Sequence, residues 1–343
     1  MDINQLQQIA QSMVKKGKGI LAADESTPTC TKRFNSIGVK STALSRNMYR
    51  DMLFTTDGME EFISGVILFD ETLRQYTLAD NIPYPQYLND KGIIPGIKVD
   101  SGAKALALHV NEKITEGLDG LRERLVEYFQ LGARFAKWRA VITIGGEIPS
   151  SSCIHANAHA LARYAALCQE TGLVPIVEPE VLMDGKHTIE TCYDVSKRTF
   201  HHVFEELNNQ DVYLEGIVLK PNMVVSGIDC KNQASIEEVS QRTVDCLKET
   251  VPDSVPGCAF LSGGQTNNAA TEHLNSMNAN YANSLPWNLT FSYGRALQSS
   301  ALMAWGGKEE NVQIAQDAFY QRAKFNSMAT TGVYSSDLEM STV

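Results

Sequence analysis

The chain has 343 residues, of which 43% are hydrophobic, and it carries a formal net charge of -10 at pH 7. The apolar content supports a substantial core and argues against a disordered chain. The acidic balance argues against a general nucleic-acid partner or an anionic-membrane partner, but it leaves room for a local cationic pocket.

The first residues contain no basic region followed by an apolar run, so we expect no secretory signal. No apolar stretch approaches the roughly 20 residues that a membrane helix needs. The seven cysteines are scattered, odd in number and never in a Cys-x-x-Cys pair. This pattern is typical of reduced thiols and gives no zinc site through cysteine. The sequence therefore predicts a cytoplasmic protein.

Short β-rich runs recur along the chain, and helical patterns separate them. The predicted strands are Gly19–Asp24, Ile63–Phe69, Ile94–Val99, Phe135–Ile142, Val174–Glu178, Leu214–Lys220, Cys258–Ser262 and Leu289–Tyr293. The predicted helices are Ile3–Lys15, Leu121–Leu131, Ile154–Thr171, Thr188–Leu207, Ile236–Thr250, Asn267–Met277 and Glu309–Ser327. Asp119 and Ser235 are predicted N-caps, and Gly132 and Gly172 are predicted helix ends.

A strand followed by a helix, repeated eight times, predicts an α/β protein with a closed (β/α)8 TIM barrel. The structural alternative is a doubly wound open sheet, which usually carries a Gly-x-Gly-x-x-Gly turn after its first strand. Residues 22–27 contain no such turn. No linker divides the chain, so we expect one barrel domain over residues 1–329 with extra N- and C-terminal helices. Residues 330–343 are predicted to be a mobile tail.

Charged residues stand at or near the C-terminal ends of the predicted strands, where barrel enzymes carry their catalytic groups. They are Asp24, Lys98, Lys137, Arg139, Glu178, Glu180, Lys220 and Arg295. Period-2 alternation places Lys137 and Arg139 on one strand face, and Glu178 and Glu180 on another. So many charges at one mouth favour a functional site over a set of structural salt bridges.

Lys220 follows the apolar run Ile217–Leu219 and precedes Pro221, which biases it toward extended backbone. A buried ammonium group is unfavourable unless it is paired. Lys220 is therefore either a salt-bridged lysine or an amine that attacks a carbonyl to form a Schiff base. The residues alone leave both interpretations open.

Two glycine-containing segments predict an anion site beside these charges. Ser262, Gly263 and Gly264 follow the seventh strand, and Gly294 and Arg295 follow the eighth. Loops at these positions often bind phosphate through backbone N–H groups, and an arginine adds a two-pronged contact. Across the mouth, hydroxyl and cationic groups could hold a second anion: Ser26, Thr29, Lys32, Arg33 and Lys98. This layout favours a substrate with a phosphate at each end.

From about Lys16 to about Asn326 the chain resembles the class I (Schiff-base) fructose-1,6-bisphosphate aldolases. The resemblance rests on blocks that occur in order, among them GKGILAADES (17–26), GVILF (65–69), GIKVD (96–100), FAKWR (135–139), VPIVEPE (174–180), LKPNM (219–223), FLSGGQ (260–265) and LTFSYGRAL (289–297). So many matched blocks make the resemblance highly specific.

The resemblance implies a reaction. Lys220 would form the iminium with the ketose carbonyl, Glu178 would be the main general acid and base, and Glu180 would lie close to the lysine. Asp24 and Lys137 would handle the C4 hydroxyl as fructose 1,6-bisphosphate splits into dihydroxyacetone phosphate and glyceraldehyde 3-phosphate. Members of the family act in glycolysis and gluconeogenesis, need no metal or other cofactor and are commonly tetrameric.

The resemblance also implies the binding residues. The one-phosphate would contact Ser262, Gly263, Gly294 and Arg295, and the six-phosphate Ser26, Thr29 and Lys98, with further contacts from Arg33 and Arg139. Thr29 stands where the family often has serine. Members of the animal type end in a tyrosine, whereas this chain ends in Val343, and we expect no active-site role for Tyr334. The preference between bisphosphate and monophosphate ketoses stays open.

Three alternatives are open. A metal-dependent aldolase needs histidine ligands, and His155 and His159 have the i, i+4 spacing of a zinc pair, although no third ligand is suggested and an exposed helix face is the simpler interpretation. A pyridoxal phosphate barrel enzyme also uses a strand-end lysine. A non-catalytic barrel that binds cytoskeletal or other protein partners is the third alternative.

Overall fold

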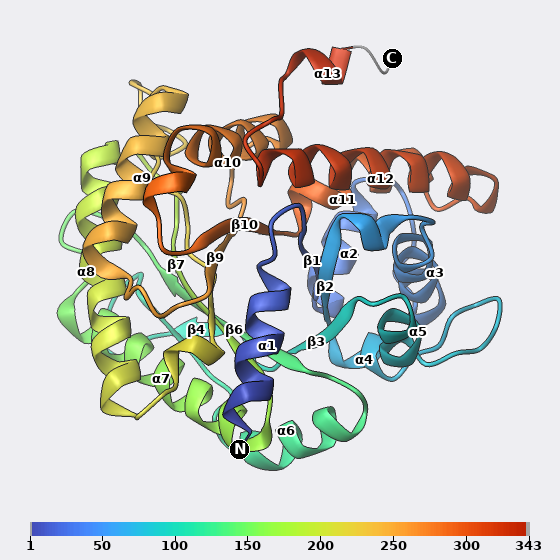
Figure 1. Ribbon diagram of the computed structural model, residues 1–343, viewed down its shortest axis with the longest axis horizontal. Helices are drawn as coiled ribbons and strands as arrows, with labels where there is room; N and C mark the ends of the chain where they lie inside the picture. Colours follow the sequence, from blue (N-terminus) through green and yellow to red (C-terminus); the bar gives the residue numbers. More distant parts are fainter. Residues whose placement is uncertain (1, 341–343) are drawn as a thin grey trace.

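The computed structural model describes residues 2–340, and its central element is a closed barrel of eight parallel strands (Figure 1). Around the ring the strands are β1 (Gly19–Ala23), β2 (Ile63–Leu68), β3 (Ile94–Lys98), β6 (Phe135–Ile142), β7 (Val174–Val181), β8 (Val218–Leu219), β9 (Gly257–Phe260) and β10 (Asn288–Tyr293). The strands keep their chain order, and β10 closes the ring against β1. The predicted barrel is thus confirmed, and the open-sheet alternative is wrong.

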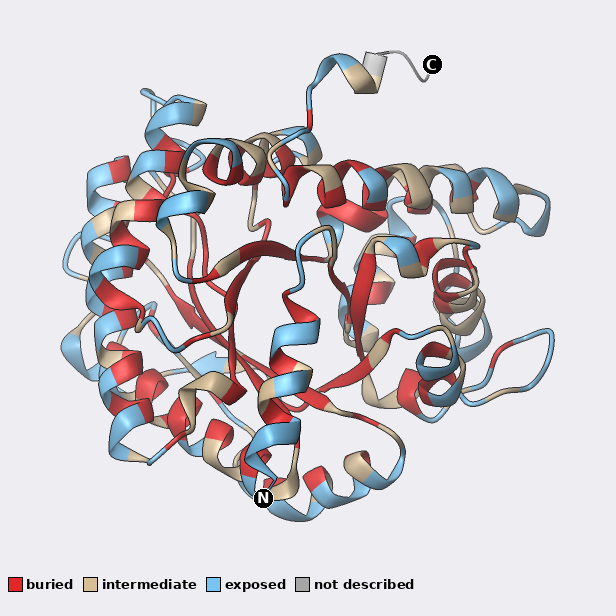
Figure 2. Cartoon of the chain, viewed as in Figure 1, coloured by how far each residue is buried: buried red, intermediate tan, exposed pale blue. Residues whose placement is uncertain are grey.

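Helices surround the barrel. They are α2 (Thr27–Asn35), α3 (Ala43–Phe54), α4 (Asp70–Leu73), α5 (Tyr84–Asp90), α6 (Leu121–Gln130), α7 (Ser151–Thr171), α8 (Ile189–Asn209), α9 (Ile236–Thr250), α10 (Asn267–Tyr281), α11 (Arg295–Trp305) and α12 (Val312–Ala329). Figure 2 shows that buried residues gather on their barrel-facing sides and exposed residues on their outer sides. The sequence analysis did not predict α2, α3, α4, α5 or α11.

Local chemistry explains where several elements differ from their predictions. The predicted strand Leu214–Lys220 begins as a 3-10 helix over Leu214–Gly216. The side-chain amide of Gln169 donates to the carbonyls of Tyr213 (2.8 Å) and Gly216 (3.3 Å), so this stretch bonds to α7 and not to a strand. An antiparallel hairpin, β4 (Ala103–Ala105) with β5 (Lys113–Thr115), was not predicted.

The predicted helix ends at Ser235 and Gly172 are confirmed, and the predicted N-cap at Asp119 is wrong. Ser235 accepts the Glu238 N–H at the start of α9, as predicted. Gly172 ends α7 at a φ of 91°, in the left-handed region that favours glycine. Asp119 is not the N-cap of α6, because Gly120 takes that position at a φ of 65°.

Helix α1 (Ile3–Met13) closes the barrel at the amino-terminal end of its strands. In Figure 1 it lies across the ring. Its residues Leu6, Ala10 and Met13 are fully buried and join one apolar cluster with the inward-facing residues of the strands: Ile20, Ala22, Ile67, Phe135, Val174, Ile176, Val218 and Ala259. We call this cluster the barrel floor.

Phe135 fills the centre of the floor because two neighbouring strands carry glycine opposite it. A Cβ atom at Gly96 would lie 2.2 Å from the Phe135 ring, and one at Gly65 would lie 3.1 Å from it. A side chain at Gly96 would therefore displace the ring.

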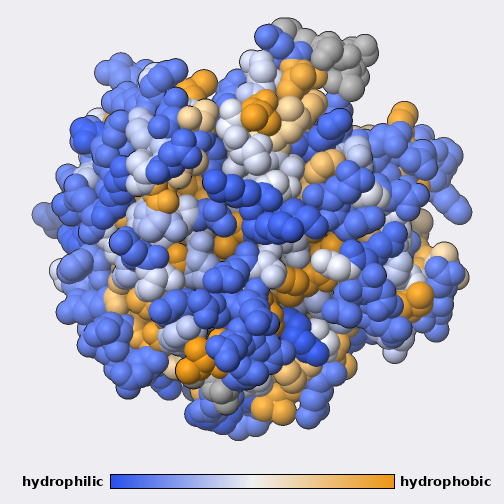
Figure 3. All heavy atoms as spheres, viewed as in Figure 1, coloured by the Kyte–Doolittle hydropathy of each residue, from blue (hydrophilic) through white to orange (hydrophobic). Residues whose placement is uncertain are grey.

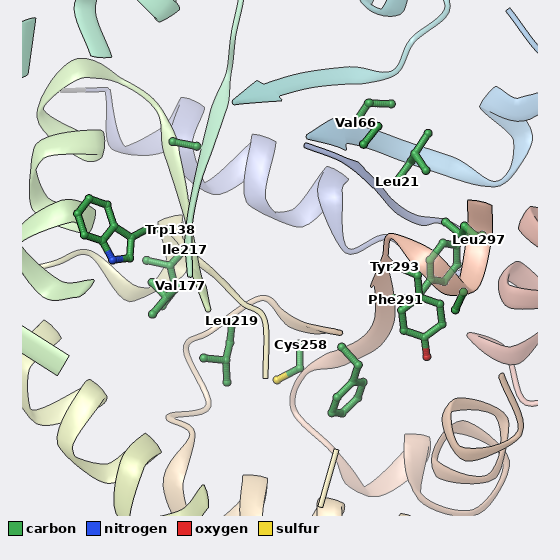
Figure 4. Close-up of a cluster of buried hydrophobic side chains, with 14 of the residues drawn as sticks. Leu21, Val66, Trp138, Val177, Ile217, Leu219, Cys258, Phe291, Tyr293 and Leu297 are labelled. Carbon is green, nitrogen blue, oxygen red and sulfur yellow. The ribbon is translucent and has the colours of Figure 1, made fainter. Parts of the chain in front are cut away.

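A second core lies between the strands and the surrounding helices. Residues that alternate with the floor residues point outward into it: Leu21, Val66, Trp138, Val177, Leu219, Cys258, Phe291 and Tyr293. Figure 4 labels these together with Ile217, just before β8, and Leu297 of α11. The Tyr293 hydroxyl donates to the Ala270 carbonyl of α10 at 2.9 Å, which satisfies the one polar atom of that side chain. The period-2 alternation of the strands thus separates two cores.

The surface is mostly hydrophilic. On the face seen in Figure 3, apolar residues lie in small separate groups. None of the described helices, within residues 2–340, has the length and apolar character to cross a bilayer. Six of the seven cysteines are buried, and Cys230 is half-buried; all seven are free thiols.

The segment after α12 packs on the outside of the barrel. Tyr334 is 6% exposed; its N–H donates to Asn275, and its hydroxyl donates to Glu339, which also pairs with Arg322 of α12. A short helix, α13 (Asp337–Met340), follows. Met1 and residues 341–343 lie outside the described residues, so the predicted mobility of 330–343 stays a prediction.

Candidate active site

A cavity of about 260 Å³ opens at the carboxyl ends of the strands, opposite the floor. Its lining consists of Ala22, Asp24, Glu25, Ser26, Thr29, Arg33, Lys98, Lys137, Arg139, Glu178, Glu180, Lys220, Leu261, Ser262, Gly263, Ser292, Gly294 and Arg295. Every residue assigned to the site from the sequence is in this set except Gly264 and Lys32. Lys32 is exposed on α2 and does not line the cavity.

Strand register explains why these side chains meet. Trp138 and Val177 point outward, so Lys137, Arg139, Glu178 and Glu180 point into the barrel. Arg139 pairs with Glu178 in the β6–β7 register, and the N–H of Lys220 donates to the Val177 carbonyl at 2.8 Å. Lys220 therefore lies beside Glu178 on the neighbouring strand.

Two buried lysines flank Glu178, and one of them also pairs with Asp24. Its Oε1 lies 3.1 Å from Lys220 Nζ, and its Oε2 lies 3.2 Å from Lys137 Nζ. Lys137 Nζ also lies 2.7 Å from Asp24 Oδ2. Among residues 2–340, Glu178 Oε2 accepts no hydrogen bond of good geometry, although it is within ion-pair distance of Lys137. The Lys137 ammonium group is therefore the partner of this buried oxygen.

The pKa values of these groups reflect burial and opposite charge. Burial alone would raise the pKa of Asp24 and of Glu178, but the ammonium groups of Lys137 and Lys220 outweigh it, so both values lie below the ordinary range. Burial alone would lower the pKa of Lys137, but Asp24 and Glu178 raise it well above its usual value. At neutral pH the two carboxylates are ionised and Lys137 is an ammonium ion.

Two further ion pairs line the walls. Arg139 Nε contacts Glu180 Oε2, and burial is outweighed by this carboxylate, so the pKa of Arg139 is raised. Lys98 Nζ donates to Asp100 Oδ1 at 2.6 Å, and the other oxygen of Asp100 accepts the backbone N–H of Arg139 at 3.3 Å. These contacts fix the orientation of the Lys98 and Arg139 side chains at the cavity wall.

The loop after β9 and the turn after β10 form one side of the cavity. Gly263 has a φ of 53°, and a Cβ at Gly294 would lie 3.2 Å from the Ala22 carbonyl oxygen, so both positions favour glycine. Arg295 Nη2 donates to the carbonyls of Gly263 (2.9 Å) and Gln265 (2.7 Å), which joins the two segments. Gly264 faces the other way, because its N–H donates to the thioether of Met183 at 2.9 Å.

The start of α2 forms the opposite side. The hydroxyls of Ser26 and Thr29 lie 3.1 Å apart at the rim. Arg33 lies deeper, where Glu25 Oε1 accepts from its Nη1. The lining as a whole has six cationic side chains and four carboxylates, so it carries two more positive than negative charges in a chain of net charge -10. This local excess suits an anionic ligand.

The sequence analysis missed two acidic residues at this site. Glu25 lines the cavity next to Asp24 at the end of β1, and Asp100, which is not in the lining, pairs with Lys98. No local pattern could have found the role of Glu25, because its partner Arg50 lies on α3. Ser292, two residues before Gly294, also lines the cavity; it is 1% exposed, and its hydroxyl has no partner among residues 2–340. Period-2 alternation from Thr290 points Ser292 inward.

The histidine pair lies far from this cavity on the outside of α7. His155 and His159 both face Glu206 of α8, at 3.8 Å and 2.8 Å. Within residues 2–340 no group of three histidine, cysteine or acidic side chains has a metal-binding arrangement. The zinc alternative therefore has no support from the geometry.

Comparison with known proteins identifies a family for this chain. The family model described as fructose-bisphosphate aldolase class-I matches residues 5–343. A probable fructose-bisphosphate aldolase class 1 from Xanthomonas campestris is 57% identical over 333 residues, covering 97% of this chain and 99% of the relative. The cytosolic fructose-bisphosphate aldolase 4 of Arabidopsis thaliana is 52% identical, covering 94% and 82%.

A solved structure is also similar to this chain over nearly its whole length. The ternary co-crystal structure of fructose-bisphosphate aldolase from Plasmodium falciparum, in complex with TRAP and a small-molecule inhibitor, superposes with a TM-score of 0.95. It is 50% identical and covers 97% of this chain and 96% of that chain.

Proposed function

Because the chain belongs to the class I fructose-bisphosphate aldolases, we propose that Lys220 is the amine that condenses with the C2 carbonyl of the sugar. The enzyme is a carbon–carbon lyase of glycolysis that cleaves fructose 1,6-bisphosphate reversibly into dihydroxyacetone phosphate and glyceraldehyde 3-phosphate. The observation that supports Lys220 is its place: a buried lysine, 4% exposed, at a strand end, 3.1 Å from a carboxylate and on the cavity wall.

Attack on the carbonyl needs a neutral amine. Glu178 Oε1 is the nearest group that can take the proton from the Lys220 ammonium. The neutral amine then adds to C2, and the proton held by Glu178 passes to the carbinolamine hydroxyl, which leaves as water. The product is an iminium ion at C2, and Glu178 is a carboxylate again.

Cleavage of the C3–C4 bond needs a base at the C4 hydroxyl. Asp24 is the candidate, since it is ionised, and Lys137 holds it at 2.7 Å. As Asp24 takes the hydroxyl proton, the C4 carbonyl forms, the C3–C4 bond breaks, and its electron pair moves into the iminium to give an enamine. The positive charge of Lys137 stabilises the developing alkoxide.

The remaining steps reverse the first ones. After glyceraldehyde 3-phosphate leaves, Asp24 gives its proton to solvent water, and Glu178 relays a proton from this water to C3 of the enamine. Addition of water to the resulting iminium, the reverse of the first step, then frees Lys220 and dihydroxyacetone phosphate. Glu180, paired with Arg139, supplies negative charge beside the lysine during these changes.

The phosphates bind at the two ends of the cavity. We assign the one-phosphate to Ser262, Gly263, Gly294 and Arg295, with Gly264 shaping the loop from behind, and the six-phosphate to Ser26, Thr29 and Lys98. Arg33 and Arg139 add positive charge between them. The support is the excess of cations in the lining and the presence of hydroxyl-bearing residues and glycines in the lining at its two ends.

A trapping experiment tests the assignment of the amine. Borohydride with dihydroxyacetone phosphate should inactivate the enzyme and add the reduced triose phosphate to the tryptic peptide that contains Lys220, as measured by mass spectrometry. The Lys137→Met variant is the matched control, since it removes the other deep amine and should still be labelled at Lys220. Labelling at Lys98 or Lys137 in the unaltered enzyme would overturn the assignment.

Assembly and location are further proposals. We infer a homotetramer in the cytoplasm, as the family resemblance and the cytosolic relatives suggest. Light scattering on the purified chain should give four times its 37.8 kDa mass. A monomeric mass at micromolar concentration would contradict the tetramer.

A further inference from the structure

Arg50 is a buried charge that the reaction does not use. It lies on α3, is 1% exposed and does not line the cavity. Its Nε donates to the Ala23 carbonyl at 2.9 Å, and its Nη1 donates to Cys30 Sγ at 3.0 Å. Its Nη2 donates to the Glu25 carbonyl at 3.1 Å and to Glu25 Oε2 at 2.9 Å. Ala23 and Glu25 lie at or just beyond the end of β1, and Cys30 lies on α2.

Glu25 divides its carboxylate between two arginines. Oε1 accepts from Arg33 at 2.5 Å, and Oε2 accepts from Arg50 at 2.9 Å. The Glu25 and Arg50 side chains are only 5% and 2% exposed, whereas the Arg33 side chain is 25% exposed. The contact between Glu25 and Arg50 is therefore shielded from water, and the one with Arg33 is at the cavity wall.

Arg33 is held on one edge and open on the other. Only its Nη1 makes hydrogen bonds among residues 2–340, to Glu25 Oε1 and to Gln298 Oε1 at 3.4 Å. Gln298 is fixed in turn, because it also accepts from the Tyr49 hydroxyl (2.9 Å) and donates to the Ala22 carbonyl (2.7 Å). The free Nη2 lies beside Gly294, 3.8 Å from where a Cβ would be, and so it faces the cavity.

Arginine and carboxylate prefer a two-pronged pair, in which both oxygens meet two N–H groups. Glu25 makes no such pair with Arg33, since Arg50 holds its second oxygen. If Arg50 were absent, Glu25 Oε2 could accept a hydrogen bond from Arg33 Nη2. The carboxylate would then make a two-pronged pair with Arg33 and neutralise the charge of its guanidinium group.

We propose that Arg50 is a positioning residue that keeps Arg33 available to a substrate phosphate by holding half of the Glu25 carboxylate. The inference rests on the proposed function in one respect, that Arg33 contacts a phosphate. It adds an organising group on α3 that never touches the substrate.

The test compares a single variant with a double variant. Arg50→Met should raise the KM for fructose 1,6-bisphosphate by about tenfold, because a charge-assisted contact to phosphate is weakened, while kcat stays within about twofold. Arg50→Met with Glu25→Gln removes the competing carboxylate as well, and its KM should return to the unaltered value or below. If the double variant keeps the raised KM, Arg50 acts only through the fold and the proposal is wrong.

Arg46 provides the matched control. It lies one turn earlier on α3 and makes a two-pronged pair with Glu71, at 2.7 Å and 2.6 Å, away from the cavity. Arg46→Met should leave KM unchanged. A similar rise in KM in this variant would show that any broken pair on α3 has the effect, and it would overturn the role of Arg50.

Two further variants separate the possible failures. Arg33→Met should raise KM at least as much as Arg50→Met. A normal KM in Arg33→Met would remove Arg33 from the phosphate site and overturn the inference, whereas trapping at Lys220 would be unaffected. Arg50→Lys is the conservative variant, since its ammonium group can still pair with Glu25 Oε2 while it loses the contacts to Ala23 and Cys30. Its KM should stay within about twofold of the unaltered value, and a tenfold rise there would contradict the proposal.

Discussion

The two ends of the barrel are made by the same strands from opposite kinds of side chain. On β6, Phe135 belongs to the floor, and Lys137 lies two residues further on in the cavity. On β7 the same step leads from Ile176 to Glu178, and after Val218 of β8 it leads to Lys220. Because every second residue points inward, a strand can carry packing at one level and chemistry at the next.

This separation has an energetic reason. Burial of the floor residues removes apolar surface from water and stabilises the fold. Burial of Lys137, Glu178 and Lys220 takes charge out of water, which is unfavourable unless the ions pair well. Apolar burial at the floor therefore stabilises the fold directly, whereas each ion at the mouth depends on its partners, and substitutions at the two ends should affect different quantities.

The largest effect is expected at the mouth, from Lys220→Ala. Loss of the amine should lower kcat on the order of 10⁴-fold or more. Glu178 keeps Lys137 as a partner, so the free energy of unfolding should change by only about 1–2 kcal/mol. Steady-state kinetics and urea unfolding measure the two quantities. Normal turnover in this variant would show that the reaction does not need Lys220. It would contradict the division between a catalytic mouth and a stabilising floor.

Glu178→Gln should have the next largest effect. The amide keeps the shape of the side chain but cannot take the proton from Lys220, so kcat should fall by about 10²–10⁴-fold with little change in KM. Glu190→Gln, on the exposed start of α8, is the control for a lost carboxylate and should leave kcat as it is. A kcat within threefold of the unaltered enzyme would assign the proton transfers to another group.

At the floor, Met13→Ala should lower the free energy of unfolding by about 2–5 kcal/mol, because Met13 is fully buried between α1 and the strands. KM and kcat of the folded protein should not change, since the cavity is at the other end of the barrel. Chemical unfolding followed by circular dichroism gives the first quantity. A tenfold loss of kcat without unfolding would show that the two ends are coupled.

The smallest effect concerns pH. Lys137 and Lys220 depress the pKa of Asp24 in the folded state, so the ionised carboxylate stabilises the fold above its unfolded pKa of about 3.9. This contribution is lost as the pH falls below about 4 through the folded pKa. The difference in unfolding free energy between the unaltered chain and Asp24→Asn should be constant from about pH 8 to 5 and shrink below pH 4. A difference that grows on acidification would contradict the sign of the shift.

Sequence patterns predicted the barrel and most of the mouth, since strand ends and alternation are local properties. Lys137, Glu178 and Lys220 were placed by the rule that carboxyl ends of parallel strands meet. The position of α1 under the barrel, the two-residue length of β8 and the direction of Gly264 depend on contacts between distant segments. The pairing of Glu25 with Arg50 joins a strand end to a helix that no pattern predicted.

The position of α1 also decides how the protein could be held on a surface. Gln8 is exposed on this helix, on the side of the molecule opposite the cavity. A Gln8→Cys variant, with Cys230→Ser to remove the half-buried thiol, would offer one accessible attachment point. Molecules immobilised there would all present their openings to the solution, which suits a flow reactor or a sensor chip.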